Sequence, residues 1–265
     1  MPRKTTSVMF PWLRVLLLSL LAGLSAWAAH AKALHFFGIM APDRVIAIDG
    51  FPGISGIVFW PERGTLVGVS SNGGVAELTL QGKVLRKRIH ENRDFEDIAL
   101  QGRPGRALII ETQHSRLDTL RLDDFEIVEQ TALPDGSSAA QGVAWSGNPP
   151  RLVLGTAFPP MLKLFRPNAE ARERTLLFGA ESVSSVIAGP GGELLLVSPD
   201  NGLLLLNADG SAAGGWWKPL QHRHMTGAAM VPGTGLVICA GRDPGVLLVF
   251  SSIKDWQALR HALSS

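Results

Sequence analysis

The chain has a single cysteine, Cys239, among its 265 residues, so an intramolecular disulfide is excluded. The cross-links that stabilise many small secreted domains are therefore absent, and stability has to come from packing of an apolar core. Cys239 lies in the apolar run Gly235–Ala240. We therefore expect a buried, inert thiol rather than a reactive one.

Known catalytic motifs are missing as well. The sequence contains no G-x-S-x-G elbow, no P-loop, no H-E-x-x-H pair and no dinucleotide-binding fingerprint. The long apolar stripes of period 3.6 that helical repeats require are also absent. The sequence thus assigns no catalytic residue and disfavours a helical-repeat fold.

The first residues have the composition of an export signal. Three basic residues are followed by an apolar run over 15–24 and by two A-x-A sequences, which predicts a signal peptide cleaved after Ala28 or Ala31. The alternative is an uncleaved anchor, but the stretch between Arg14 and His30 is shorter than the roughly 20 residues of a spanning helix. Residues 1–28, or 1–31, are therefore assigned to a leader.

Removal of this leader changes the charge balance. Lys and Arg fall from 25 to 22 against 23 Asp and Glu, a formal net charge of −1. No nucleic-acid partner is expected from such a balance. We expect a monomer that is periplasmic or secreted, and peripheral association with the outer face of the inner membrane is an open alternative.

A faint unit recurs five times, and each copy opens on a small or polar residue followed by an apolar strand. The openings are spaced by 41, 45, 43 and 42 residues and begin at Ser55, Glu96, Gln141, Ser184 and Thr226. This period is typical of one four-stranded propeller blade. In the fourth copy, turn residues separate three apolar runs, and a fourth strand can follow toward Trp216-Trp217. The sequence predicts an all-β, five-bladed β-propeller over 38–253, with six blades as the alternative.

Two further elements are predicted at the ends of the propeller region, a closing strand at the start and a helix at the end. The last copy has room for three strands only, while the run Arg44–Ile48 before the first copy has no partner. We predict that this N-terminal strand completes the last blade, which closes the ring and removes open sheet edges. Trp256, Leu259 and Leu263 recur at helical spacing, so residues 254–265 are predicted to form a short C-terminal helix and tail.

Short motifs in the blades carry a family resemblance. They are Ile54-Ser55-Gly56-Ile57, Asn72, Asp94-Phe95-Glu96-Asp97-Ile98, Ile110-Glu111, Gln141-Gly142-Val143-Ala144-Trp145 and Leu206-Asn207-Ala208-Asp209-Gly210. In order and spacing, over Arg44 to Phe250, the chain resembles the SdiA-regulated, or YjiK-like, family of exported five-bladed propellers. The resemblance implies a calcium-linked role in some relatives and a looser kinship to calcium-dependent phytase-like propellers. It supplies no defined reaction.

Polar side chains are expected to converge at one end of the axial channel. In a propeller, the first strand of each blade lines the axis and the second returns beside it, so the start of the first strand lies next to the end of the second. Converging side chains at a propeller mouth are the default place for a ligand. The predicted ligand mouth consists of Ser55, Asn72, Gln141, Ser184, Thr226 and Arg242.

The same end offers carboxylates. Glu96, Glu111 and Asp200, with Ser or Asn oxygens, could hold one divalent cation such as Ca²⁺, which takes about six to eight oxygen ligands, or a cationic ligand. However, Gln141, Thr156 and Thr226 are neutral where the resemblance leads one to expect acids. The alternative is that Glu96 and Glu111 hydrogen-bond to backbone N–H groups, or pair with Arg242, and so tie adjacent blades together.

Three further features each have two interpretations. His222 and His224 could bind a transition metal or be solvated. The basic run Arg86–Arg88 could contact anionic lipid or discourage pairing at the edge of an outermost strand. Trp216 and Trp217 could stack on a ligand or pack between blades.

The sequence favours a non-catalytic exported propeller that binds an unknown protein or small-molecule ligand at its axial mouth. The alternative is a metal-dependent hydrolase acting on a phosphoester, ester or lactone, in which Glu96 and Glu111 hold the ion that activates water. Whether the protein is an enzyme stays open at this point.

Overall fold

The structure is a computed structural model. It describes residues 37–134, 137–147, 149–165, 173–176, 181–219, 224–241 and 245–264. The chain divides into two units, Met1–Phe37 and Gly38–Ser265, and the blades belong to the second. The predicted leader, His222 and Arg242 lie outside the described residues. None of the helices in the described part is both long and apolar enough to cross a membrane.

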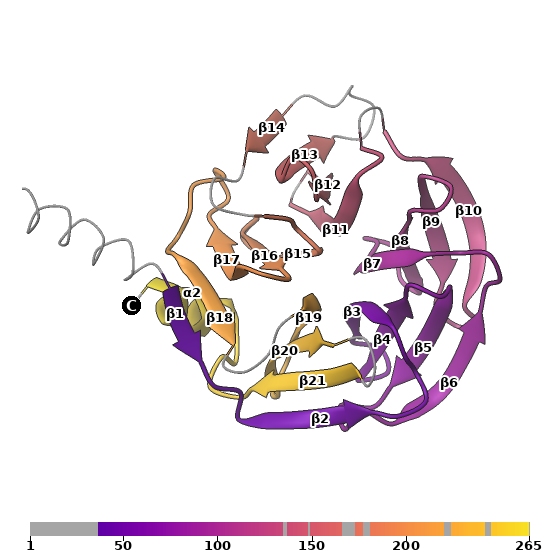
Figure 1. Cartoon of the computed structure of the whole chain (residues 1–265), viewed down its shortest axis with the longest axis horizontal. Helices are drawn as coiled ribbons and strands as arrows, with labels where there is room; N and C mark the ends of the chain where they lie inside the picture. Colours follow the sequence, from indigo (N-terminus) through magenta and orange to yellow (C-terminus); the bar gives the residue numbers. More distant parts are fainter. Residues whose placement is uncertain are drawn as a thin grey trace, which may run out of the picture. The chain divides into compact units, whose positions relative to one another are not determined.

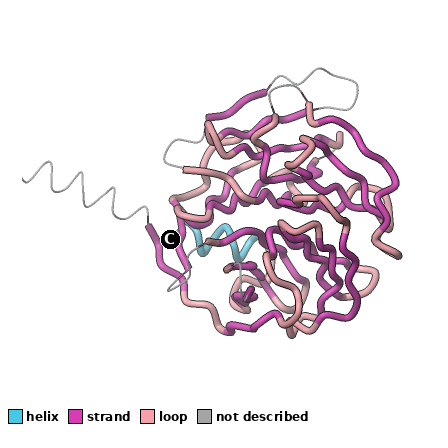
Figure 2. Tube along the Cα trace, turned by 45° about the vertical axis from the view of Figure 1, so that its right-hand side comes forward, coloured by secondary structure: helices cyan, strands magenta, loops and turns pink. Residues whose placement is uncertain are grey.

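Five antiparallel sheets surround a common axis within Gly38–Ser265 (Figure 1), and strands make up most of this unit (Figure 2). Blade 1 consists of β3 (Ile54–Trp60), β4 (Thr65–Ser70), β5 (Gly74–Leu78) and β6 (Val84–Ile89). Blade 2 consists of β7 (Phe95–Leu100), β8 (Arg106–Glu111), β9 (Arg116–Arg121) and β10 (Glu126–Ala132). Blade 3 consists of β11 (Ala140–Ser146), β12 (Arg151–Thr156), β13 (Met161–Phe165) and β14 (Glu173–Leu176).

The remaining two blades use strands from both ends of the unit. Blade 4 consists of β15 (Ser185–Ala188), β16 (Leu194–Ser198), β17 (Gly202–Leu206), β18 (Trp216–Pro219) and β1 (Phe37–Met40). Blade 5 consists of β19 (Met225–Val231), β20 (Gly235–Ala240), β21 (Gly245–Phe250) and β2 (Arg44–Ile48). The prediction of an all-β propeller with five blades is confirmed, and the ring does not have six.

The inner strands start at or beside the five repeated openings. Each of β3, β7, β11 and β15 contacts the inner strand of the next blade, and β19 contacts β3. These contacts close the ring around the axis. The repeat in the sequence is therefore the repeat of the blades.

Ring closure by the N-terminal strand is also confirmed. Strand β2 pairs antiparallel with β21, from Arg44 opposite Val249 to Ile48 opposite Gly245. Strand β1, which the sequence did not predict, extends the sheet of blade 4 beside β18. Two consecutive strands of the N-terminal segment thus join blades 4 and 5.

The core is divided among the junctions between blades. Five clusters of buried apolar side chains fill the five junctions, one cluster between each pair of neighbours. Second strands such as β16 and β20 are buried along their whole length, because a neighbouring blade covers each face. Cys239 of β20 is fully buried, as predicted.

The C-terminal helix α2 spans Trp256–Ser264, as predicted. Asp255 precedes it and accepts a hydrogen bond from Ala258 N at 2.8 Å through Oδ1, which caps the helix. Leu259 and Leu263 are buried against the cluster between blades 4 and 5. The helix is therefore fixed to the propeller by its apolar face.

Trp216 and Trp217 pack in two different junctions of β18. Trp216 belongs to the cluster between blades 3 and 4, and Trp217 packs against the cluster between blades 4 and 5. The prediction of packing between blades is confirmed.

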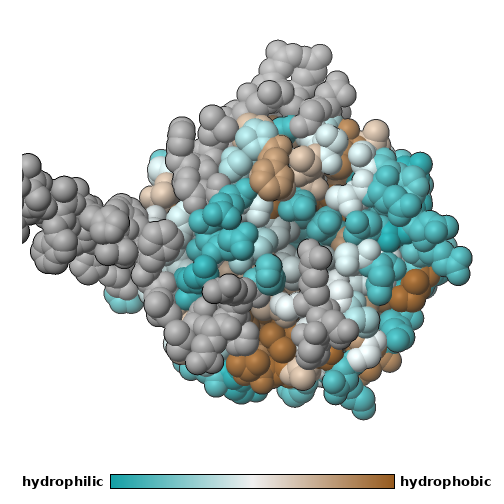
Figure 3. Space-filling model, viewed as in Figure 1, coloured by the Kyte–Doolittle hydropathy of each residue, from teal (hydrophilic) through white to brown (hydrophobic). Residues whose placement is uncertain are grey.

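The basic run Arg86–Arg88 lies on β6, the outermost strand of blade 1. Arg86 donates to Glu77 Oε2 at 2.6 Å and to Leu122 O at 2.8 Å, and Arg88 donates to Glu126 Oε1 at 2.8 Å. The bond to Glu77 lies within blade 1, and the bonds to Leu122 and Glu126 link blade 1 to blade 2. The outer strand β10 of blade 2 lies under a hydrophilic part of the surface (Figure 3).

Candidate functional site

Three hydroxyls of the predicted ligand mouth bond to the backbone of a neighbouring blade. Ser55 Oγ donates to Phe95 O of blade 2 at 2.5 Å, and Ser184 Oγ donates to Met225 O of blade 5 at 3.1 Å. Thr226 Oγ1 donates to Ile54 O of blade 1 at 3.0 Å. These contacts tie blades 1 and 2, 4 and 5, and 5 and 1 together at the start of the inner strands.

The other predicted mouth residues differ in their surroundings. Asn72 is exposed, and its side-chain oxygen accepts a hydrogen bond from Ser70 Oγ. Gln141 is half-buried at the start of β11. Arg242 lies outside the described residues. The structure thus brings Ser55, Ser184 and Thr226 into contacts between blades and leaves Asn72 at the surface.

Asp97 makes the most extensive polar contacts at this end of the axis. Its Oδ2 accepts hydrogen bonds from Val143 N at 2.9 Å and Val186 N at 3.3 Å, and its Oδ1 accepts one from Ser185 Oγ at 3.0 Å. The residue is fully buried. Burial raises the pKa of Asp97 well above its usual value, while these hydrogen bonds and one from Ile98 N oppose the shift. One carboxyl of blade 2 thereby holds blades 3 and 4.

Glycines make room for this carboxyl. The residue equivalent to Asp97 is Gly56 in blade 1, Gly142 in blade 3, Ser185 in blade 4 and Gly227 in blade 5. A Cβ atom on Gly56 would lie 2.7 Å from Asp97 Oδ1, and one on Gly227 would lie 2.9 Å from Gly56 Cα. We call these five residues the axial latch. The sequence signal for it was glycine at the same place in three copies.

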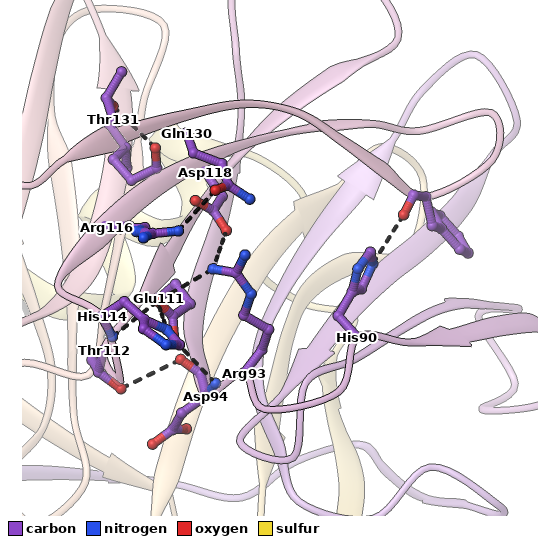
Figure 4. Close-up of polar contacts among 12 residues, drawn as sticks. His90, Arg93, Asp94, Glu111, Thr112, His114, Arg116, Asp118, Gln130 and Thr131 are labelled. Atoms are coloured by element: carbon purple, nitrogen blue, oxygen red, sulfur yellow. Dashed lines mark hydrogen bonds and ion pairs between the residues drawn. The ribbon is translucent and has the colours of Figure 1, made fainter.

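A second polar cluster lies within blade 2 and includes the predicted Glu111 (Figure 4). Glu111 is fully buried, and its Oε2 accepts hydrogen bonds from His114 N at 3.0 Å and from the His114 ring at 3.1 Å. Arg93 Nη1 lies 3.6 Å from Glu111 Oε2 and 3.4 Å from Asp118 Oδ2. Burial raises the pKa of Asp118, and the positive charge of Arg93 opposes the shift. The carboxylate of Glu111 is thus held by a backbone N–H and by Arg93.

The three predicted metal ligands do not all belong to one blade. Glu96 and Glu111 lie on neighbouring strands of blade 2, whereas Asp200 lies in an exposed turn after β16 of blade 4. Over the described ranges, no group of three or more His, Cys, Asp or Glu side chains is placed to hold a metal ion. Calcium needs about six to eight oxygen ligands. The calcium-linked role therefore stays a prediction from the family resemblance.

A cavity of about 340 Å³ lies at the other end of the inner strands. All of its lining side chains in the described part of the chain are apolar, and they come from all five inner strands, the two following prolines and helix α2. They are Ile57, Val58, Phe59, Pro61, Ile98, Ala99, Leu100, Ala144, Trp145, Val186, Ile187, Ala188, Ala228, Ala229, Met230, Pro232 and Trp256. We call this space the axial cavity.

The axial cavity has a buried end and an open end. Ile57, Ile98 and Val186, which lie next to the axial latch in the sequence, are at most 3% exposed. Phe59 and Met230, nearer the ends of their strands, are half-buried. The latch therefore lies at the inner end, and the opening faces the turns that follow the inner strands.

The chemistry of this lining is restricted. Among the residues that the structure describes, it contains no titratable or nucleophilic side chain, so these residues offer no general acid, general base or covalent nucleophile. Its volume lies within the range of about 300–1,000 Å³ typical of ligand pockets. Apolar surface of this kind can bind a ligand by removing it from water.

Sequence reasoning missed the axial cavity because its residues read as ordinary strand residues. Five of the lining residues are alanines, and small side chains on adjacent inner strands leave space at the axis. Small residues in the second half of each repeated strand were the available signal.

Comparisons with known proteins give the fold. No family model and no curated protein matches the chain. A glutaminyl cyclase from Myxococcus xanthus matches with a TM-score of 0.64 and 14% identity, over 81% of this chain and 98% of that chain. A catalytically inactive virginiamycin B lyase from Staphylococcus aureus, solved with quinupristin, matches with a TM-score of 0.45 and 16% identity, over 73% of this chain and 64% of that chain. The cyclase supports the β-propeller fold and, at this identity, nothing more.

Proposed function

We propose that the protein is a non-catalytic binding protein that takes a small apolar ligand into its axial cavity. The observation that carries this proposal is the composition of the lining, in which five inner strands and Trp256 contribute only apolar side chains. The sequence predicted a ligand site at the start of the inner strands. The site proposed now is the axial cavity, at the other end of the same strands. There the lining is free of the contacts between blades that engage Ser55, Ser184 and Thr226.

The proposal includes a cellular setting. The leader and the motif order favour an exported propeller of the SdiA-regulated type, in the periplasm or outside the cell. This part rests on the sequence and has its own test, which is N-terminal sequencing of the mature protein after export. Cleavage after Ala28 or Ala31 is the expected result.

A metal-dependent hydrolase is the competing function. Its residues would be Glu96 and Glu111 of blade 2, but Arg93 and His114 already engage Glu111. We do not extend the activity of the glutaminyl cyclase to this chain, because only the fold is shared. The binding function is therefore the one that the geometry favours.

Titration with an uncharged apolar dye, N-phenyl-1-naphthylamine, tests the binding function. We expect saturable binding at one site, with a free energy of about 4–8 kcal/mol, which corresponds to a micromolar to millimolar Kd. The Ala188→Leu variant adds bulk to the cavity lining and should weaken binding. Ala132→Leu, which changes an exposed residue at the end of β10, is the matched control. The proposal fails if the dye does not saturate or if both variants bind it like the unmodified protein.

A further inference from the structure

A second hollow of about 270 Å³ adjoins the axial cavity between the turns of blades 1 and 2. Its lining residues are Glu62, Leu100, Gln101, Gly102, Arg103, Pro104, Gly105, Arg106 and Leu122. Leu100 lines both spaces. A Cβ atom on Gly102 would lie 3.1 Å from Nε1 of Trp145, so an aromatic wall of the axial cavity contacts the second hollow. We call this space the side hollow.

The side hollow carries positive charge. Arg103 is exposed and Arg106 is half-buried, and neither forms an ion pair with a carboxylate of the described residues. Glu62 is the acidic residue of the lining, so the formal sum is one positive charge. Guanidinium groups bind carboxylates through paired N–H donors.

The loop that carries these arginines is held by its backbone. Gln101 N donates to Arg106 O at 3.0 Å, and Arg106 N donates to Arg103 O at 3.3 Å. The side-chain oxygen of Gln101 is buried and has no hydrogen-bond partner among the described residues. An ionised carboxylate has no donor for this oxygen, so Gln101 takes no part in binding the head group, and the two arginines alone carry that role.

We propose that the ligand is an anionic amphiphile with a single apolar chain and a carboxylate head. The chain occupies the axial cavity, and the head lies in the side hollow beside Arg103 and Arg106. This inference rests on the proposed binding function and names its ligand class. As far as the described residues show, one of the two adjoining spaces has an apolar lining and the other has two guanidinium groups without a carboxylate partner, and these match the two parts of such a molecule.

Calorimetric titration with decanoate and decanol tests the inference, because the two probes share a chain and differ in charge. We expect decanoate to bind about two- to fivefold more tightly than decanol at low salt, the range of a partly exposed ion pair. The Arg103→Ala, Arg106→Ala double variant should lose this preference and keep the affinity for decanol. Added salt should reduce the preference in the unmodified protein.

Arg44→Ala is the matched control, since Arg44 is exposed on β2 of blade 5 and should leave both affinities unchanged. If both probes bind equally and the double variant changes neither affinity, the ligand class is wrong while the binding function stands. If neither probe nor the uncharged dye binds, both proposals fail.

Discussion

Replacing Asp97 tests whether the axial latch holds the ring together. In the Asp97→Ala variant, Val143 N and Val186 N lose their acceptor inside the protein, whereas the Ser185 hydroxyl can rotate. Two buried donors without a partner cost about 1–3 kcal/mol each, or about 2–6 kcal/mol together. Part of this loss is offset, because the variant no longer buries an acid whose ionisation is unfavourable in the folded protein. We expect a net loss of about 2–4 kcal/mol, measured by urea unfolding at pH 7.

The Asp97→Asn variant separates hydrogen bonding from charge. Its side-chain oxygen can still accept from the two backbone donors, so we expect a loss of about 1 kcal/mol or less. Because the pKa of Asp97 is raised in the folded protein, its contribution to stability is complete below the ordinary value of 3.8. The contribution is then lost as the pH rises from that value through the raised pKa, by about 1.4 kcal/mol for each unit of the shift.

As the pH rises from 3.8 through the raised pKa, the free energy of unfolding of the unmodified protein should therefore fall relative to that of the Asp97→Asn variant. Asp200→Asn, which changes a carboxyl to an amide at an exposed position, is the control. The reasoning is refuted if Asp97→Ala unfolds at the same urea concentration as the unmodified protein, or if the difference for Asp97→Asn does not vary with pH.

Three other measurements address the remaining residues. Calcium, magnesium, manganese and a chelator should each leave Tm unchanged; a calcium-dependent rise that Glu111→Gln abolishes would instead support the hydrolase. Arg93→Ala should destabilise the protein by about 2–4 kcal/mol in urea unfolding, because two buried carboxylates lose their cation, and an unchanged midpoint would show that Arg93 contributes little. Burial raises the pKa of Cys239 to about 12, so the folded protein should not react with a thiol reagent at pH 8 while the unfolded protein should; rapid reaction without denaturant would contradict this.

In the described part of the chain, the exposed apolar side chains do not form a large patch on the outer surface. Among the described residues, the large apolar ones that are exposed are Val45, Leu85, Ile89, Val128 and Phe158. On the face seen in Figure 3, apolar side chains form small separate patches within a mainly hydrophilic surface. Scattered residues of this kind do not by themselves mark an interface. We therefore place recognition in the cavities rather than on the outer surface.

The part of the fold that could be predicted was set by local pattern. The five openings recur at nearly constant spacing, and the apolar run Arg44–Ile48 had no partner in its own repeat, so the blade count and the closure by β2 followed. The helix at Trp256 followed from the spacing of its apolar residues. Strand β1 could not be predicted in this way. It has only four residues, and it forms because the closed ring places it beside β18 at the outer edge of blade 4.

The sequence by itself predicted the propeller, the order of its blades and its closure, and favoured five blades over six, because turn residues and short apolar runs act over a few residues and repeat in each copy. Only the tertiary structure decided which contacts the residues at the five repeated openings make. Whether Ser55 or Asp97 faces a ligand or the backbone of another blade depends on contacts between residues 40 or more positions apart. The axial cavity likewise exists only where small residues of five separate strands meet around one axis.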